Sequence, residues 1–568
     1  MYRFYFMLLF VLFYLGTMPV AEAVVPSPGS MEEQESRMQQ HEQQISSKEA
    51  AEESQRRSQE KMLQSKKENK GLERITLPQE DPSFVIKNFQ LRGPDVEKFQ
   101  WIQEYLNQYA NEKVGINGMN LLLKQINAAL VNKGYITTRV YLKEQDIASG
   151  FLMFDLAPGT IHEIRFADKR TWGTWKTAFS VHKGDLLNIR DLEQGLEQMK
   201  RVPSQDVDIK IEPAEQPGQS DVVLTVKRTK PWKLVQSIDD SGLESTGKIQ
   251  ATTALEWDNL FAINDIFNVS LNEDAQRDGE KRGTRANSIY YSVPFGRQTV
   301  SFSASNYQYH QRVNTAVVPF LSSGKIENYD LGITSLIARD QVRKTNLEFH
   351  ILKKKRQSFI DGTEISVQRQ NTTALQLGIT QKQYIGKSVL DTAIRYQHGV
   401  DWLGSTPGAT DGVSDEPTTQ YGMFLLDVNW NTPLKMGKET GQYNLTLRMQ
   451  QARNYLYGSE FFSIGGRYSV RGFDGEQTLS AENGLLIRNE FRLPIHKNHQ
   501  LYAAIDYGKV SGPSTEYLLG RELVGAALGI RGTMKNTQYD VFVGWPLDKP
   551  QGFKTGAQTY GFQLTMQL

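Results

Sequence analysis

The chain has 568 residues, a net charge of +1 at pH 7 and no cysteine. A near-neutral charge argues against a nucleic-acid binder, because such proteins normally carry a basic excess. Without cysteine, a disulfide framework, a thiol nucleophile and a thiolate metal site are excluded.

The first 23 residues, MYRFYFMLLFVLFYLGTMPVAEA, have the pattern of a secretory signal peptide. Arg3 precedes an apolar run from Phe4 to Leu15, and the A-x-A sequence at 21–23 fits the cleavage rule. The apolar run is shorter than the ~20 residues that a membrane-spanning helix needs. We therefore predict a signal peptide over 1–23, cleavage after Ala23 and export of the mature chain.

Residues 24–46 are predicted to contain a polar helix that begins near residue 31. Ser30 and Glu33 form a capping box at its start. Three apolar residues follow at seven-residue spacing: Met31, Met38 and Ile45. At 1.5 Å per residue such a helix is roughly 24 Å long, comparable to the apolar thickness of a bilayer.

Residues 31–70 contain no Phe, Trp, Tyr or Val and cannot bury a core. A fully disordered leader is therefore an alternative to the helix. We predict a polar linker over 47–74.

Residues 75–229 show the same pattern twice, a strand followed by two helices and two strands. We predict two small α+β domains, over 75–157 and 158–229. In the second, the predicted first helix covers about 172–181. Neither domain contains a recognisable pair of nucleophile and base, so the sequence does not indicate an enzyme.

From residue 230 to residue 568 the sequence alternates apolar and polar residues, as strands do, and has no helical period. We predict about sixteen strands. The connections after odd-numbered strands are long, and those after even-numbered strands are tight turns such as 295–297. Long loops on one side, short turns on the other and an even strand count are typical of an outer-membrane β-barrel.

The last strand, YGFQLTMQL at 560–568, has large apolar residues on one face and carries no charge. An unguarded edge of this kind promotes aggregation in a soluble protein. We predict that its apolar face contacts lipid and that its edge pairs with the strand near Trp232, which closes the barrel. A soluble sandwich is the alternative, but Gln563, Thr565 and Gln567 make the other face too polar for it.

The longest loop, 453–483, is rich in glycine and contains Arg471 within the sequence GRYSVRGFDGEQ. The two strands that follow it place Arg488, Glu490 and Asp506 on the lumen side, with Asp506 opposite Arg488. An inward-folded loop therefore brings a guanidinium to a carboxylate that it can bind in two places. The spacing equally allows Asp506 to pair with Arg488 alone, with Arg471 solvated.

These features resemble the TpsB transporters of two-partner secretion, in the superfamily that includes the barrel-assembly factors. The resemblance rests on the signal peptide, polar helix, two repeats, sixteen strands and the V-R-G-F motif, and it covers nearly the whole mature chain. The motif comprises Val470, Arg471, Gly472 and Phe473. In this family the repeats are POTRA domains, the helix plugs the pore, and the loop Arg reaches a strand motif of the form F/G-x-D-x-G.

That strand motif corresponds here to residues 504–508, with Asp506 and Gly508 as the matching positions. Ala504 stands where the family prefers Phe or Gly, and Leu568 replaces the common terminal Phe. The first departure implies a looser contact beside Asp506. The second implies an altered detail of recognition by the assembly machinery.

The resemblance implies an outer-membrane pore that takes one large unfolded exoprotein from the periplasm and exports it without ATP. It also implies periplasmic POTRA domains, membrane lipid, chaperones and the barrel-assembly machinery as partners during biogenesis, a monomeric state, and no cofactor or metal. The alternative within the superfamily is an assembly factor for other barrels. The sequence leaves open whether the exoprotein is a haemagglutinin, a haemolysin or a contact-dependent inhibition toxin.

Overall fold

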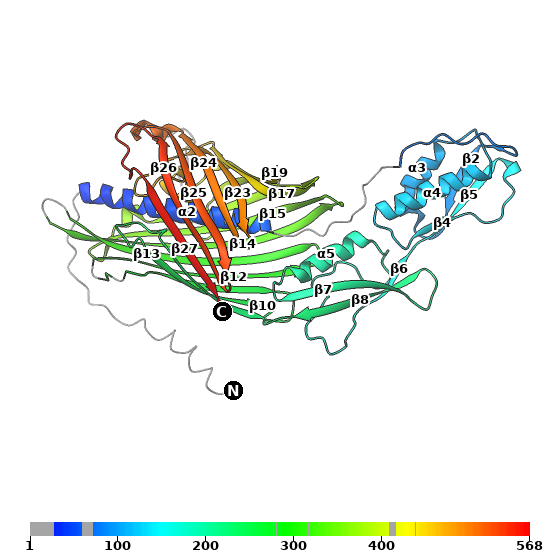
Figure 1. Ribbon diagram of the computed structural model, residues 1–568, viewed down its shortest axis with the longest axis horizontal. Helices are drawn as coiled ribbons and strands as arrows, with labels where there is room; N and C mark the ends of the chain where they lie inside the picture. Colours follow the sequence, from blue (N-terminus) through cyan, green and yellow to red (C-terminus); the bar gives the residue numbers. More distant parts are fainter. Residues whose placement is uncertain are drawn as a thin grey trace.

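The computed structural model describes residues 28–59, 72–276, 278–279, 281–314, 318–407, 416–437 and 439–568. The predicted signal peptide lies outside these residues. In chain order the protein forms a long helix, two small α+β repeats and a closed barrel, with the first repeat far from the barrel (Figure 1). None of the described helices is both long and apolar enough to cross a bilayer.

The N-terminal helix, α2, runs from Pro28 to Gln59 and is longer than predicted. Residues 47–59, predicted to be part of a linker, are helical, and residues 60–71 lie outside the described chain. The sequence SKEAAEESQRRSQ at 47–59 has no Gly, Pro or β-branched residue, so intrinsic propensity carries the helix onward. Residues 24–27 of the predicted plug also lie outside the described chain.

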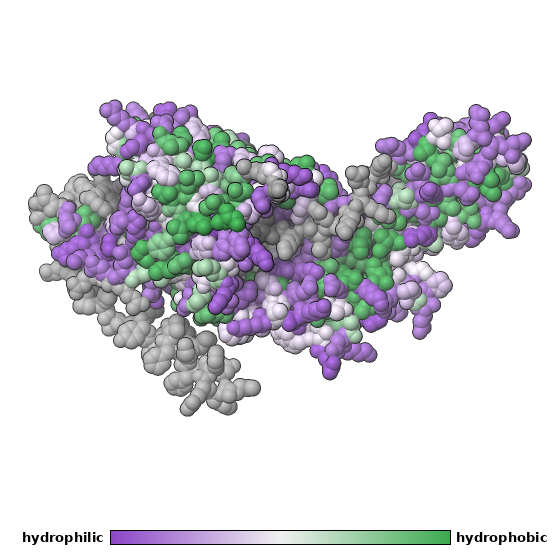
Figure 2. Space-filling model, viewed as in Figure 1, coloured by the Kyte–Doolittle hydropathy of each residue, from purple (hydrophilic) through white to green (hydrophobic). Residues whose placement is uncertain are grey.

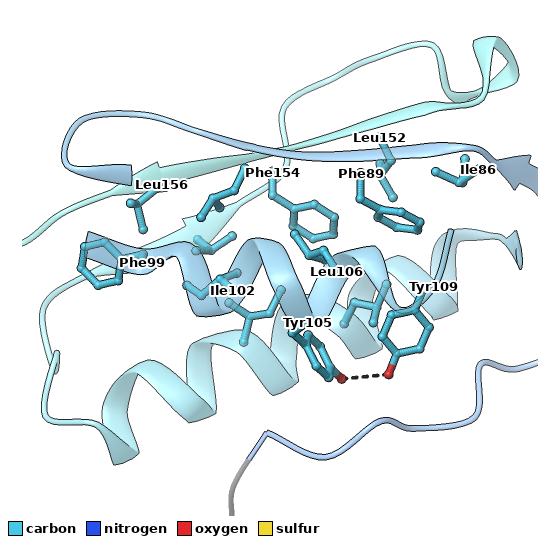
Figure 3. Close-up of a cluster of buried hydrophobic side chains, with 14 of the residues drawn as sticks. Ile86, Phe89, Phe99, Ile102, Tyr105, Leu106, Tyr109, Leu152, Phe154 and Leu156 are labelled. Carbon is cyan, nitrogen blue, oxygen red and sulfur yellow. Dashed lines mark hydrogen bonds between the residues drawn. The ribbon is translucent and has the colours of Figure 1, made fainter. Parts of the chain in front are cut away.

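The first repeat packs helices α3 and α4 against strands β2 and β5 (Figure 3). Its elements are β1 Phe84–Ile86, β2 Asn88–Arg92, η1 Val96–Phe99, α3 Gln100–Asn107, β3 Glu112–Val114, α4 Ile116–Asn132, β4 Arg139–Tyr141, η2 Ile147–Ser149 and β5 Phe151–Ala157. On α4, Leu122, Ile126 and Leu130 are fully buried, as their spacing predicts. In the same core the Tyr109 hydroxyl donates to that of Tyr105 at 3.0 Å.

The second repeat has one helix instead of the predicted two. It comprises β6 Thr160–Phe166, α5 Ile189–Lys200, β7 Gln205–Pro213 and β8 Gln219–Arg228. The helix predicted over 172–181 is wrong, because the barrel's turns take up backbone groups of this segment. The Thr174 amide donates to the Ala262 carbonyl, and the Thr177 carbonyl accepts from the Gly296 amide.

Helix α5 holds the second repeat to the short turns of the barrel. The Arg339 guanidinium is 2.7 Å from Glu197, and the Lys344 ammonium is 3.2 Å from the same carboxylate. Arg297, in a neighbouring short turn of the barrel, pairs with Asp191. These turns therefore lie on the same side of the barrel as the repeats.

The barrel contains sixteen long antiparallel strands within the described residues, as predicted. They are β9 Trp232–Asp239, β10 Gln250–Asp258, β11 Ile266–Asp274, β12 Arg282–Phe295, β13 Gln298–Val313, β14 Phe320–Arg339, β15 Arg343–Ile360, β17 Gln370–Ile385, β18 Ser388–Val400, β19 Gly422–Met436, β20 Glu439–Ala452, β23 Asn483–His496, β24 His499–Ser511, β25 Glu522–Met534, β26 Thr537–Asp548 and β27 Thr559–Gln567. The two-residue strand β16, Thr363–Glu364, pairs antiparallel with the end of β15.

The last strand closes the barrel against the first, so the predicted pairing is confirmed. Gln563 to Gln567 of β27 pair antiparallel with Val235 to Asp239 of β9. On the outer face of β27, Tyr560 is 67 % and Leu564 42 % exposed. Figure 2 shows hydrophobic surface over the middle of the barrel wall, where a bilayer would contact it.

Candidate functional site

The loop between β20 and β23 folds back into the barrel lumen. Within it, β21 Phe462–Ile464 and β22 Leu479–Ala481 pair as a small hairpin. An apolar cluster joins this loop to the wall strands β23, β24 and β25 and to loop 549–558. Its buried members are Phe462, Ile464, Val470, Phe473, Leu479, Ala481, Leu486, Val510, Leu523 and Phe553. Two motif residues, Val470 and Phe473, therefore anchor the loop by apolar burial.

The structure brings Arg471 and Asp506 into direct contact. The guanidinium donates to both carboxylate oxygens, through Nε at 2.7 Å and Nη2 at 2.8 Å, and the Arg471 amide donates to the same group at 3.0 Å. Asp506 is fully buried, and Arg471 is 5 % exposed. This is the forked geometry that arginine can form and lysine cannot.

Arg488 is not the main partner of Asp506, as the alternative prediction would require. It is the cross-strand partner of Asp506, but its Nε lies 3.6 Å from that carboxylate. Its other nitrogens donate to the carbonyls of Arg467 and Tyr468, both at 3.3 Å. Arg488 thus binds the loop backbone, and pairing of Asp506 with Arg488 alone is wrong.

Glu490 is the second carboxylate of the site. It accepts from Arg471 and from Arg492, and Arg531 lies 3.1 Å from it. Arg531 in turn is 3.3 Å from Asp540. Four guanidinium groups (Arg471, Arg488, Arg492 and Arg531) therefore share three carboxylates (Asp506, Glu490 and Asp540), so the cluster has one excess positive charge.

Glycines on the wall let the loop backbone lie flat against it. A Cβ on Gly525 would meet the Arg471 carbonyl at 1.9 Å, and one on Gly544 would meet Gly472 at 2.8 Å. Gly472 itself has φ +104° and lies against the Trp545 backbone. Gly508, which the strand motif includes, lies beneath Val470 and Ile464. Glycines on three neighbouring strands therefore leave space in the wall for the loop backbone.

Beside Asp506, Ala504 is buried in a cluster with Tyr502, Ala527 and Phe542. The small side chain at this position is thus packed by residues of β24 itself, of β25 and of β26. Phe542 comes from β26, which is not adjacent to β24 in the sheet.

Helix α2 fills the lumen beside the loop and contacts the wall mainly through polar groups. Glu42 is 3.3 Å from Arg356, and Glu53 is 2.7 Å from Arg395. Gln34 donates to the Ser323 carbonyl at 2.9 Å. Of the three apolar residues predicted on one face, Met38 is fully buried with Tyr309 and Ile326, and Ile45 packs at the edge of that cluster. The side chain of Met31 is outside what the structure describes.

The helix also contacts the loop. Gln40 donates to the Glu476 carbonyl at 2.7 Å, and Gln43 accepts from Ser480 at 2.7 Å. Beside these contacts lies a cavity of about 460 Å³, bounded by α2, the loop, β26 and β27. On its wall, Arg467 of the loop is 2.8 Å from Asp240, which also accepts the Phe562 amide of β27.

Sequence reasoning missed Gly525, Gly544, Arg467 and Arg531. The two glycines had a readable signal, because both occupy lumen-facing positions of predicted strands where side-chain bulk is otherwise expected. Arg467 had none, since its partner Asp240 lies 227 residues away. Arg531 had one, because Asp540 lies directly opposite it across the short β25–β26 turn. Among the described residues, no cluster of three or more His, Asp or Glu side chains is placed to hold a metal ion.

Comparison with known proteins gives consistent matches along the chain. Residues 218–532 match the family described as haemolysin secretion/activation protein ShlB/FhaC/HecB, and residues 84–159 and 160–213 match POTRA domains. The outer membrane transporter CdiB-2 of Burkholderia pseudomallei is 39 % identical over 87 % of this chain and 88 % of its own length. The hemolysin transporter protein ShlB of Serratia marcescens is 28 % identical over 66 % of each. The solved structure of CdiB from Acinetobacter baumannii is 27 % identical, covers 96 % of this chain and all of its own, and has a TM-score of 0.83.

Proposed function

Because the chain belongs to the ShlB/FhaC/HecB family of outer-membrane transporters, with its POTRA domains in the periplasm, we propose the following mode of transport. The transporter exports one large unfolded exoprotein through its barrel without ATP. Identity is higher to CdiB-2 than to ShlB, which favours a contact-dependent inhibition exoprotein over a haemolysin. Closure of the sheet on itself supports a monomer as the working unit.

The observation that carries this proposal is the contrast between the two elements in the lumen. Both elements have buried ion pairs, but the loop is also fixed by an apolar cluster, whereas α2 buries little apolar surface beyond Met38. Charged and amide contacts can be exchanged for water at small net cost, but buried apolar surface cannot. We infer that α2 is the removable plug and that the loop is its fixed seat.

Recognition of the exoprotein falls to the second repeat. Strand β7 pairs with β8 and stands at the edge of its three-stranded sheet, order β6-β8-β7, so an extended segment can add to it by backbone pairing. Its exposed side chains carry charges of both signs, on Asp206, Asp208 and Lys210. Backbone pairing rather than net charge therefore supplies the affinity.

We expect disulfide crosslinks between Lys210→Cys and cysteines placed along the N-terminal segment of the exoprotein to recur at every second residue. The native chain has no cysteine, so each crosslink is unambiguous. A strand added to β7 presents alternate residues to it, and its affinity falls only modestly with salt. Glu215→Cys, in the turn that follows β7, is the control and should give no periodic pattern.

Non-periodic crosslinking with a steep loss of binding in salt would contradict backbone pairing. It would point instead to the basic residues Lys227, Arg228 and Lys230 at the end of the repeat.

A further inference from the structure

A cluster of basic residues lies on the outer wall of the barrel, away from the lumen. It comprises Lys325 on β14 and Lys353 and Lys355 on β15. Their strand parity is that of Leu331 and Phe349, which are 45 % and 38 % exposed on the outside. The opposite parity faces the lumen, where Ile326 contacts Met38 of α2.

The cluster lies where the apolar band of the wall ends. Strand β15 begins at Arg343, on the side of the second repeat, and its outer face then carries Leu347, Phe349 and Ile351. Ten residues of a strand at 3.4 Å each, tilted by about 40°, rise about 26 Å, the height of a bilayer's apolar band. Lys353 and Lys355 therefore lie at the level of the outer-leaflet headgroups.

The cluster carries more positive than negative charge. Glu327 on β14 pairs with Lys325 and lies 3.8 Å from Lys355. Lys353 is 7 % exposed, and its ammonium donates to the Thr373 hydroxyl at 3.1 Å. Within the described residues Lys353 has no carboxylate partner. A nearly buried ammonium without a counter-charge is costly, and an anion from outside the chain would offset that cost.

Aromatic side chains beside the cluster fit the same membrane level. Tyr329 is 37 % exposed, and the Lys355 ammonium lies 5.8 Å from its ring centre. The loop after β18 folds over the outer wall, where the Trp402 carbonyl accepts from Thr373 and the Trp402 side chain is 55 % exposed. Tyr and Trp are enriched where acyl chains meet headgroups.

We propose that Lys325, Lys353 and Lys355 form a binding site for the phosphate groups of the glycolipid that forms the outer leaflet of the membrane. Lys325 and Lys355, whose side chains are 33 % and 49 % exposed, contact the phosphate, and Lys353 adds charge from behind them. The bound lipid fixes the wall strands β14 and β15, which hold the plug through Ile326 and Arg356 on their inner face.

The test measures binding of purified lipid A to the full-length transporter in detergent, with EDTA present so that no divalent cation bridges the two. We expect Lys325→Gln/Lys355→Gln to raise the dissociation constant for doubly phosphorylated lipid A about 25-fold, at about fivefold for each basic residue. Glu327→Gln should tighten it about fivefold, because it removes the carboxylate that competes with phosphate. Tighter binding by Glu327→Gln cannot arise from misfolding.

The matched control is Lys387→Gln/Lys497→Gln, which removes two exposed lysines from turns at the other end of the barrel. It should bind lipid A as the native protein does. Equal binding by the native protein and Lys325→Gln/Lys355→Gln, or equal binding of dephosphorylated lipid A, would overturn the proposal. Either result would mean that the acyl chains alone account for the interaction.

Discussion

Secretion of the exoprotein should fall about tenfold or more in both Arg471→Ala and Asp506→Ala, while the barrel still resists heat in detergent. Either change leaves a buried charge without its main partner, which typically costs 3–5 kcal/mol. The backbone hydrogen bonds between the barrel strands do not depend on this ion pair, whereas the position of the loop does. Export assays with a heat-mobility gel on the same samples separate the two effects.

Asp506→Ala should be the more harmful of the two changes. It leaves four guanidinium groups facing two carboxylates, whereas Arg471→Ala leaves three facing three. The double variant should be little worse than Asp506→Ala, as expected for coupled residues. Arg471→Lys should rescue poorly because it lacks the fork. Simple addition of the two single effects would contradict coupling between them.

Deleting residues 28–59 should convert a nearly closed barrel into a steadily conducting pore in planar-bilayer recordings. A sixteen-stranded barrel encloses a water-filled channel unless something fills it, so the expected conductance is of the order of a porin's. The loop should remain seated, because its apolar cluster contains no residue of α2.

Met38→Ser/Ile45→Ser is the matched variant for this deletion. It keeps the helix and its charged contacts but removes its apolar ones, so brief openings rather than a steady pore are expected. Unchanged conductance on deletion would mean that α2 does not close the channel at rest.

The barrel could be predicted from the sequence because alternation along each strand records which face meets lipid. The ends of some strands on the extracellular side are harder to predict from the sequence. Strand β14 begins with the residues FLSSGK at 320–325, which have little apolar contrast. Their pairing with β13 extends beyond the lipid. Because these residues do not contact lipid, they lack the alternation of apolar and polar side chains that predicts a strand.

The two helix errors have different physical causes. Residues 47–59 lack apolar residues, which predicts a linker, but inside a polar lumen a helix needs no apolar face. Glu53, for example, meets the buried Arg395. Residues 172–181 have helical spacing, with Trp175 and Phe179 in the core, yet their backbone groups bond to the barrel. Periodicity alone does not record such tertiary hydrogen bonds.

For the site, strand parity allows the pairing of Arg471 with Asp506, and the resemblance to the TpsB family favours it over pairing of Asp506 with Arg488 alone. They could not reveal that the loop is also fixed by an apolar cluster, since Leu523 and Phe553 come from strands and loops that follow it in the chain. The contacts of the wall glycines could not be predicted for the same reason. Gly525 matters because the Arg471 carbonyl lies against it, and that contact depends on the final fold.

Reversible tethering of the plug tests most directly whether α2 must leave its seat during export. Met38 lies against Gly324 of β14, so Met38→Cys with Gly324→Cys can be joined by a short reducible bis-methanethiosulfonate bridge. Each single-cysteine variant treated with the same reagent serves as a control. We predict that export stops when the bridge forms and resumes when it is reduced. Export at the untethered rate with the bridge intact would contradict this prediction.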